Sequence, residues 1–368
     1  MNPRIRSSVG VVINPGLVEF FKGNTRRSVM LKMNSEAARI ICSLDGTRSI
    51  EAICAEYNMD QETEKNFTAL IDYLMDKCIV YDQDTRIENE DRKIYSRVFS
   101  MLEDYSCNED ILQKAWGNIK NARVCIVGIG AVGSWIAANL VQSGVKNLVL
   151  IDNDVVDITN LHRQWGYVSE DVGKRKTACL KKRLMDMDES VKIEEINTFI
   201  KEGKLEEINF GEVDLIIDCA DKPTVDETAI WIGGYCMKRN IPHIIAGGYN
   251  LHVSLIGQTI IPHKTACVKC FEKQLREHNE LELANMKKLA TPGRKIGSIG
   301  PMCSLSASFA SLEAIKVLSK LISPSNVNRR GEFNIYNMEI KYHEYNKIEE
   351  CEWCGNNGKY REQNNLFG

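Results

Sequence analysis

A short glycine-rich run, GIGAVG, is the segment of this sequence with the clearest chemical signature. Gly128, Gly130 and Gly133 follow the apolar stretch Val124–Val127 and open a predicted helix, Val132–Ser143. Glycines at this spacing let the backbone turn tightly and bring N–H groups to a phosphate at the start of a helix, where the helix dipole favours negative charge. The pattern therefore predicts a nucleotide-binding turn between a strand and a helix.

An acidic residue and a set of polar side chains come after this turn. Asp152 follows the predicted strand Leu148–Ile151, at the place where dinucleotide-binding folds hold the ribose hydroxyls. NAD and ATP both carry ribose and phosphates, so the glycines and Asp152 fit either nucleotide. The residues beyond Asp152 favour ATP, because an arginine and a lysine can neutralise phosphate oxygens as pyrophosphate leaves, while amides orient them. These candidate phosphate ligands are Asn160, Arg163, Gln164 and Lys176.

Two carboxylates end a later predicted strand, in the run DLIIDCADKP. Asp218 and Asp221 follow the apolar residues Leu215–Ile217. Ligands bind outside the carboxyl ends of strands in sheets of this kind. Asp221 is therefore a candidate to hold Mg²⁺ beside the phosphates.

Together these motifs resemble those of the adenylating family that includes ubiquitin-activating enzymes, ThiF and MoeB. The patterns GxGxxG, DxDxVxxxNLxRQ, GxxK and DCxD occur in that order between roughly Lys93 and Cys354. The resemblance implies that Asp152 contacts the ATP ribose, that the four polar side chains named above contact phosphates, and that Asp221 coordinates Mg²⁺. It also implies that Arg97, in the segment YSR, reaches the γ-phosphate of ATP in a partner subunit, so that the protein is a homodimer. A solvated helix arginine is the alternative for Arg97.

Two C-x-x-C pairs lie far apart in the chain. They are Cys267 with Cys270 and Cys351 with Cys354. In a reduced compartment such pairs indicate either a four-cysteine zinc site or a redox pair. The adenylating family places two pairs in these positions, so the resemblance implies a structural Zn²⁺ with no open coordination position.

Other candidate groups have a plainer explanation. Cys303 resembles a packing position of the family's GPxxGxxGSLxALEAIK helix, and a buried apolar cysteine is the simpler interpretation. Residues 272–298 are polar and lysine-rich and are interpreted as a loop that crosses over the acceptor. Within it Lys288, Arg294 and Lys295 are candidates to contact a substrate carboxylate, although a solvated loop is the simpler alternative.

The elements that must position these residues alternate between strand and helix from Val124 onward. This order predicts an α/β fold, Rossmann-like, with a mainly parallel sheet. We expect three parts in the chain: residues 1–84 as a small domain, 85–118 as a linker and helical segment, and 119–368 as the adenylating domain. The linker is expected over the polar run Thr85–Lys93, and helix over Ile94 to about Trp116.

The first 84 residues predict three short strands, three helices and a closing strand, a winged-helix-like α+β unit. The run LKMNSEAARIICSLDGTRSIEAI resembles the PqqD-like peptide-recognition domains of peptide-maturation enzymes. That resemblance implies binding of an extended leader peptide as an added strand at a sheet edge. DNA binding is disfavoured, because residues 1–84 hold ten Lys and Arg against twelve Asp and Glu and DNA-binding modules need a basic face. A purely structural cap is the other alternative.

Composition and net charge limit the partners and the cellular compartment that we expect for this protein. The net charge of −3 gives no electrostatic case for nucleic acid or an anionic membrane as partner. There is no signal-peptide pattern and no apolar run long enough to span a bilayer. The thirteen cysteines are odd in number and scattered, which is typical of a reduced, cytoplasmic protein.

The domain combination resembles the enzymes that mature the peptide antibiotics microcin C and pantocin A. It implies ATP-dependent adenylation of a carboxyl group on a ribosomally made precursor peptide. Two alternatives stay open: adenylation of a ubiquitin-like sulfur-carrier protein, and a non-catalytic partner that delivers a leader peptide. The sequence identifies neither the peptide nor the carboxyl group that is activated.

Overall fold

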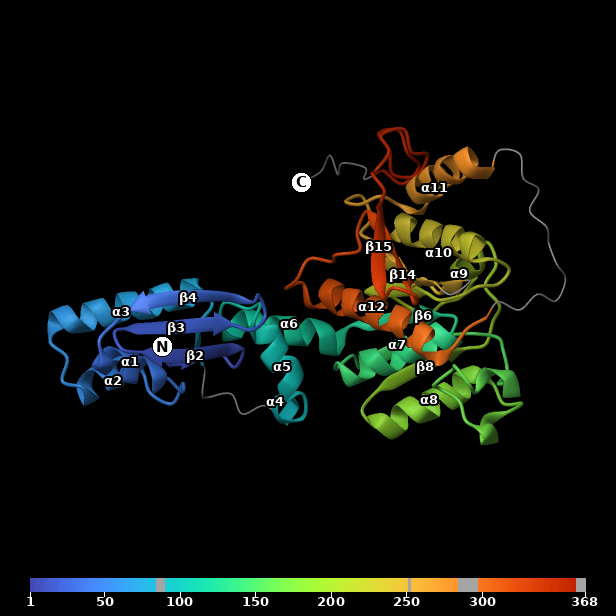
Figure 1. The fold of residues 1–368 in the computed structure, drawn as a ribbon. Helices are drawn as coiled ribbons and strands as arrows, with labels where there is room; N and C mark the ends of the chain where they lie inside the picture. The colour runs from blue at the N-terminus through green and yellow to red at the C-terminus, as the bar shows by residue number, and fades with distance from the viewer. Residues whose placement is uncertain (84–89, 251–252, 284–296, 362–368) are drawn as a thin grey trace, which may run out of the picture. The chain divides into compact units, whose positions relative to one another are not determined.

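The computed structural model describes residues 1–83, 90–250, 253–283 and 297–361 (Figure 1). The chain divides into two compact units, Met1–Gly117 and Asn118–Gly368. Among the described residues, no helix combines the length and the apolar composition that crossing a membrane requires.

The first unit begins with two small sheets and three helices. Its strands are β1 (Pro3–Ile5), β2 (Val9–Asn14), β3 (Leu17–Lys22), β4 (Arg27–Lys32) and β5 (Val80–Asp82), and its first helices are α1 (Ser35–Cys42), α2 (Ile50–Glu56) and α3 (Gln61–Asp76). Strands β2, β3 and β4 form an antiparallel meander, and β1 pairs with β5. The three central strands and three helices agree with the predicted elements, whereas β1 was not expected.

Local capping explains where these helices begin. The side chains of Asn34, Ser49 and Asp60 accept hydrogen bonds from backbone N–H groups three residues later, at the starts of α1, α2 and α3. Each cap satisfies a donor that would otherwise be unpaired at a helix N-terminus. Phe20 of β3 and Ile71 of α3 are fully buried in one core. The meander and the helices are therefore two layers packed against each other.

Helices α4 (Glu90–Ile94), α5 (Ser96–Glu103) and α6 (Glu109–Asn121) follow. The expected linker over Thr85–Lys93 is corrected at its end, because Glu90–Lys93 lie in helix α4; residues 84–89 lie outside the described residues. The expected single helical segment is interrupted before α6, where the Asn108 side chain accepts a hydrogen bond from the N–H of Ile111. A cap at that position starts a new helix.

A buried arginine joins the start of this unit to its last helices. The guanidinium of Arg6 donates to the backbone oxygens of Glu103 and Ser106 and lies over the Tyr81 ring. The Tyr81 hydroxyl in turn donates to Glu109 at 3.0 Å. A guanidinium buried in this way needs such acceptors, so these contacts tie β1 and β5 to α5 and α6.

The second unit is built on a six-stranded sheet. Its order is β13, β10, β9, β6, β7, β8, with all neighbours parallel except the antiparallel pair β10 and β13. The strands are β6 (Arg123–Val127), β7 (Asn147–Ile151), β8 (Lys192–Ile196), β9 (Leu215–Asp218), β10 (His243–Ile245) and β13 (Gln258–Ile260). The predicted α/β fold with a mainly parallel sheet is confirmed.

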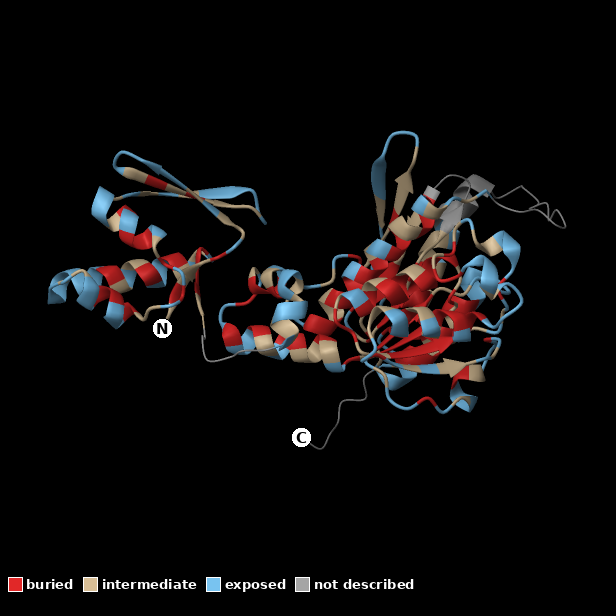
Figure 2. Ribbon diagram, turned by 90° about the horizontal axis from the view of Figure 1, so that it is seen from below, coloured by how far each residue is buried: buried red, intermediate tan, exposed pale blue. Residues whose placement is uncertain are grey.

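Helices cover this sheet, and a second sheet completes the unit. The helices are α7 (Ala131–Gln142), α8 (Lys176–Met187), α9 (Lys204–Glu207), α10 (Val225–Arg239), α11 (Val268–Leu283) and α12 (Gly300–Ser319), with 3₁₀ turns at Ile158–Asn160 and Ser169–Asp171. The second, antiparallel sheet contains β11 (Tyr249–Asn250), β12 (Val253–Ile256), β14 (Arg329–Asn334) and β15 (Glu339–Glu344). Figure 2 shows the central strands buried, β14 mostly of intermediate burial and β15 mostly exposed at its start.

The strand order sets the position of the site. Strand β6 has β7 on one side and β9 on the other, so the connections leave in opposite directions from the middle of the sheet. In parallel sheets such a switch point opens a crevice at the carboxyl ends of the strands. The loops that follow β6, β7 and β9 all begin there.

Candidate active site

The glycine-rich turn after β6 is packed against its neighbours. Gly128 has φ +82°, and a Cβ at this residue would lie 2.8 Å from the backbone of Cys219. At Gly133 a Cβ would lie 2.0 Å from the carbonyl oxygen of Gly128. Both positions therefore require glycine, the first for its backbone conformation and the second for the close approach of helix α7 to the turn.

Gly130 differs from these two glycines. A Cβ there would meet only the Gln164 amide, at 3.7 Å, so the protein itself leaves room at this residue. Gly130 is also the N-cap of α7, and no side chain caps that helix. An uncapped helix start beside open space is the arrangement that accepts a phosphate.

Asp152 links the strand β7 to the glycine-rich turn. One of its carboxylate oxygens accepts the N–H of Ile129 at 2.9 Å, and the other accepts the N–H of Asp154 at 2.8 Å. The Tyr167 hydroxyl donates to the Ile129 carbonyl oxygen at 2.6 Å. The structure therefore brings Asp152 next to the glycine-rich turn and adds Tyr167 as a residue that holds the turn in place; the contact of Asp152 with a ribose stays a prediction.

Lys176 lies in a charged cluster at the same edge. Its side chain is 6% exposed, and its ammonium donates to Asp154 Oδ2 at 3.0 Å. The ammonium of Lys222 lies 3.3 Å from the same oxygen. Burial alone would raise the pKa of Asp154, but the two lysines, Lys176 above all, lower it below its usual value. Asp154 therefore stays ionised near neutral pH.

Arg163, Gln164 and Asn160 lie on the turn after β7. The Arg163 guanidinium donates to the Thr159 carbonyl oxygen at 2.7 Å, and Gln164 is buried beside Gly130. Asn160 uses its side-chain oxygen within the turn, where it accepts the N–H of Asp157. Gln164 thus lies at the start of α7, the Arg163 guanidinium is held against its own turn, and Asn160 supports the loop that carries both residues.

Buried polar atoms without a partner surround this edge of the sheet. Among the described residues they include Ser134 Oγ, Arg163 Nε, Gln164 Oε1 and Asp218 Oδ2. Buried polar groups in proteins are almost always hydrogen-bonded. Such orphaned groups around an open helix start fit a site that is completed by a polar ligand such as a nucleotide.

The two aspartates after β9 have different environments. Asp218 is 3% exposed, and burial raises its pKa to about 7, although the N–H of Ala220 and the Thr228 hydroxyl oppose this rise. Asp221 is exposed on the loop that follows. Of the two, Asp221 is the one that a Mg²⁺ ion in solution could reach, and its role as a ligand stays a prediction.

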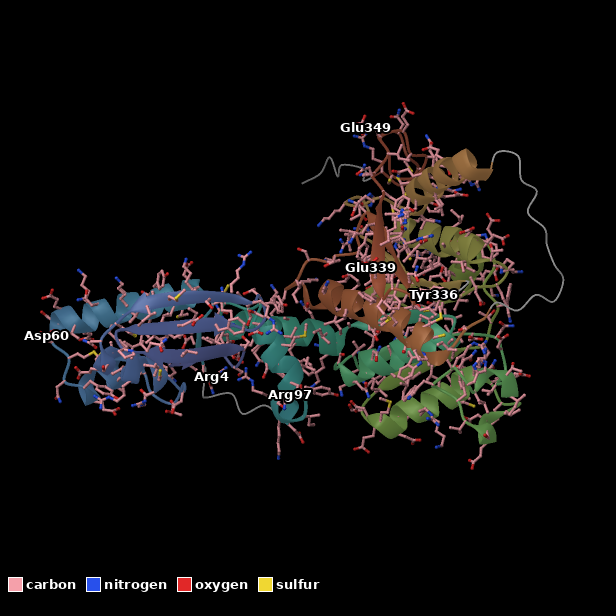
Figure 3. All side chains as sticks on the ribbon, in the orientation of Figure 1. Arg4, Asp60, Arg97, Tyr336, Glu339 and Glu349 are labelled. Carbon is pink, nitrogen blue, oxygen red and sulfur yellow. The ribbon has the colours of Figure 1, made fainter. Side chains whose placement is uncertain are left out.

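Arg97 belongs to the first unit, whereas the other predicted phosphate ligands belong to the second. It is exposed near the start of α5 (Figure 3). The structure therefore does not bring Arg97 together with them within one unit. Its predicted role at a partner's ATP stays a prediction.

The four predicted metal ligands converge. Cys267, Cys270, Cys351 and Cys354 are all buried, and their sulfur atoms lie within 4.8 Å of one another. The measured contacts of 3.9, 3.6 and 3.4 Å are close to the ~3.8 Å edge of a tetrahedron with Zn–S bonds of about 2.3 Å. Two backbone N–H groups, of Ile348 and Trp353, also point at cluster sulfurs. The donor set fits zinc.

The remaining candidates do not join the site as reactive groups. Cys303 is fully buried on α12 beside Ser298, and burial raises the pKa of its thiol. A thiol with a raised pKa is a poor nucleophile at neutral pH. The expected loop over residues 272–298 is wrong at its start, because helix α11 continues to Leu283. Lys288, Arg294 and Lys295 lie outside the described residues.

Comparison with known proteins assigns the fold. Residues 107–354, about two thirds of the chain, match the ThiF family. The chain belongs to the ThiF family. Among curated proteins, the tRNA threonylcarbamoyladenosine dehydratase of Bacillus subtilis is 34% identical over 149 residues, which are 40% of this chain and 58% of that protein. The chain therefore spans little more than half the length of that relative.

Solved structures extend the likeness to nearly the whole chain. E. coli MccB bound to AMPCPP and MccA superposes with a TM-score of 0.75 at 23% identity, covering 96% of this chain and all of MccB. PaaA has a TM-score of 0.71 at 19% identity and covers 93% of this chain and all of PaaA. At such identities the likeness shows a shared fold, so this ThiF-family chain has the architecture of MccB and PaaA.

Motif reasoning missed two parts of the site. Asp154 lies within the DxD pattern but was not singled out, and Lys222 lies just after DCxD. Their contact joins residues 68 positions apart, so no local spacing could have found it. The contact is seen only in the folded structure, where the loops that follow β7 and β9 come together.

Proposed function

We propose that this chain is an ATP-dependent adenylating enzyme that activates a carboxyl group of a ribosomally made precursor peptide. The observation that carries the proposal is the convergence of the glycine turn, Asp152 and Lys176 at the carboxyl ends of β6 and β7, beside orphaned buried polar atoms. The family match and the MccB complex with AMPCPP and MccA support the same chemistry.

The site residues have separable tasks in this reaction. Asp152 would hold the ribose, and the start of α7 would hold phosphate oxygens. An ionised carboxylate of the peptide attacks the α-phosphorus, the bond from that phosphorus to the bridging oxygen breaks, and the electron pair leaves with pyrophosphate. Arg163 and Lys176 stabilise the negative charge that develops on the phosphoryl oxygens. No general base is needed, because the nucleophile carries no proton.

Two ions complete the proposal. Asp221 would hold Mg²⁺, which supplies charge neutralisation at the phosphates when bound. The four cysteines would hold a structural Zn²⁺. Cys267 and Cys354 hold the pKa of the Cys270 thiol well below its usual range, which suits a thiolate ligand.

The first unit is proposed to bind the leader part of the peptide. Its meander has two outer strands, β2 and β4, and each offers an edge to an added strand. Val12 of β2 and Met30 of β4 are 49% and 63% exposed, so apolar side chains are available there for contact. We further propose that the enzyme acts as a homodimer in which Arg97 serves the partner's site.

The test is ATP–pyrophosphate exchange by the full-length protein. Synthetic peptides encoded by short open reading frames beside the gene are added one at a time, and mass spectrometry then identifies the product. We expect exchange that depends on one such peptide and that is lost in Arg163→Ala.

Other outcomes identify the alternatives. Exchange driven by a sulfur-carrier protein with a di-glycine tail, and by no peptide, would favour carrier adenylation. ATP consumption by neither the wild type nor Arg163→Ala, with any cognate peptide, would favour a non-catalytic delivery role.

A further inference from the structure

Lys222 is the charged group at the nucleotide edge that the motifs leave unassigned. It follows Asp221 directly, on the loop between β9 and α10. Its ammonium lies 3.3 Å from Asp154 Oδ2, the oxygen that also accepts Lys176 at 3.0 Å. One carboxylate oxygen from the β7 loop therefore serves two lysines that come from different elements.

The two lysines share a single carboxylate oxygen. Two ammonium groups face one carboxylate, and the lysines keep the pKa of that carboxyl low, after burial is set against them. Asp152 and Asp221 lie next to this group in the chain, so the cluster as a whole has no excess of positive charge. It does place two ammonium groups at the sheet edge where the uncapped α7 also begins, and ammonium groups beside a helix start favour an anion.

The two lysine side chains differ in how freely they can move. The Lys176 side chain is 6% exposed and fixed at the start of α8, whereas the Lys222 side chain is 63% exposed. An exposed ion pair contributes little to stability. Lys222 can therefore leave Asp154 at low cost, while the buried Lys176 cannot leave it without losing its partner in a site shielded from water.

We propose that Lys222 is a second phosphate-binding lysine, which exchanges Asp154 for the β- and γ-phosphates when ATP binds. In the adenylation step it donates to the pyrophosphate oxygens that gain charge as the bond from the α-phosphorus breaks. No proton is transferred. This inference rests on the proposed function, because it assigns a further residue to the same nucleotide site.

The test compares two nucleotides that differ in the groups Lys222 would contact. AMPCPP carries β- and γ-phosphates and AMP does not. Binding of each, with Mg²⁺, is measured by calorimetry for the full-length wild type, Lys222→Met and Lys222→Arg. A matched control is Lys182→Met, because Lys182 is also exposed, at 79%, and also paired with one carboxylate, that of Asp186 at 3.0 Å.

We expect Lys222→Met to weaken AMPCPP binding about tenfold or more, as loss of a charge-assisted hydrogen bond does, and to change AMP binding less than twofold. Lys222→Arg should restore most of the affinity, and Lys182→Met should match the wild type.

Three results would overturn the inference. They are unchanged AMPCPP affinity in Lys222→Met, equal losses for AMP and AMPCPP, and an equal loss in Lys182→Met. Failure of the proposed adenylation chemistry looks different, because the wild type itself would then bind neither nucleotide; a change of substrate from peptide to carrier protein leaves this binding test unaffected.

Discussion

At the scale of single residues, Asp218 shows how the sheet edge controls an ionisable group. It ends β9, and one of its oxygens accepts the N–H of Ala220 at 3.0 Å. Its other oxygen is buried without a partner. Burial raises the pKa of Asp218 to about 7, and the nearby Asp221 adds to the rise. The ionised form is therefore costly in the folded protein without ligand.

This environment predicts a pH-dependent stability. The folded pKa of about 7 lies above the unfolded value of about 3.9. The contribution of the protonated Asp218 to the free energy of unfolding is therefore fully present below pH ~4 and is lost as pH rises toward 7. Asp218→Asn should remove this loss, which amounts to about 1–4 kcal/mol. Urea unfolding of wild type and variant at pH 5.5 and 8 measures it.

The control for Asp218→Asn is Asp226→Asn, which changes an exposed carboxylate of α10. We expect Asp226→Asn to leave the pH dependence of the free energy of unfolding as it is in the wild type. Equal slopes for the wild type and Asp218→Asn would contradict the assignment of the raised pKa.

At the scale of elements, the packing of α7 on the β6 turn separates two glycines that look alike in the sequence. A methyl group at Gly133 would collide with the Gly128 carbonyl, whereas one at Gly130 meets only ordinary contacts. Close packing of a helix on a turn does not tolerate the first of these without a backbone shift. The two positions therefore have different reasons to be glycine.

Alanine substitutions should separate these reasons. Gly133→Ala should lower the free energy of unfolding by about 1–3 kcal/mol or more, as followed by urea unfolding. Gly130→Ala should lose less stability but weaken AMPCPP binding, because its methyl group would occupy the space left for a phosphate. The distinction is wrong if the two variants lose stability equally and bind AMPCPP equally.

The meander of the first unit makes a second prediction at this scale. If a leader peptide adds to the β4 edge, Met30→Asp should weaken binding of the cognate synthetic peptide by tenfold or more, because a charge enters an apolar contact. Val12→Asp, on the opposite edge, is the matched variant and should then have little effect. Fluorescence anisotropy with a labelled peptide measures both.

The two variants also identify the edge. A loss in Val12→Asp alone would assign binding to β2. Wild-type affinity in both would argue against strand addition at this sheet.

At the scale of the whole molecule, the cysteine cluster connects segments that are remote in the chain. Cys267 and Cys351 are 84 positions apart, and Phe271, Tyr345 and Trp353 pack around the cluster. A metal held by both pairs would therefore fasten residues 351–354 to the start of α11. Such a site adds stability rather than chemistry.

Removal of the metal tests this role. We expect one zinc ion per chain by elemental analysis, and we expect chelation or Cys351→Ser to lower the unfolding temperature by several degrees. AMPCPP binding below that temperature should change little, because Asp152 and Lys176 lie on other elements. Protein that contains no zinc and is indifferent to chelators would contradict the assignment.

The proposed homodimer makes a further prediction at this scale. Arg97→Ala and Lys176→Met should each be nearly inactive alone. If Arg97 serves the partner's site, an equal mixture after subunit exchange should recover up to about a quarter of wild-type activity, because half of the dimers are mixed and each has one intact site. No recovery despite demonstrated exchange would place Arg97 in its own subunit's site, and an active Arg97→Ala variant would place it outside catalysis.

The sequence by itself determined the α/β class, the glycine turn, Asp152 and the two cysteine pairs. These features are local: strand, turn and helix succeed one another within a few residues, and glycine positions and C-x-x-C spacing can be found without knowing any distant contact. Their assignment to ATP and zinc came from the ordered motifs.

Only the tertiary structure decided how the charged groups are shared. The pairing of Asp154 with Lys176 and Lys222, the burial of Asp218 and the difference between Gly130 and Gly133 all depend on loops that meet at the carboxyl ends of separate strands. Several strands were likewise not predicted. Strands β1, β11, β12 and β13 are only two to four residues long, and β8, β14 and β15 are rich in charged residues, so they lack a clear apolar pattern. Contacts between segments remote in sequence have no local signature, so the folded sheet alone brings them together.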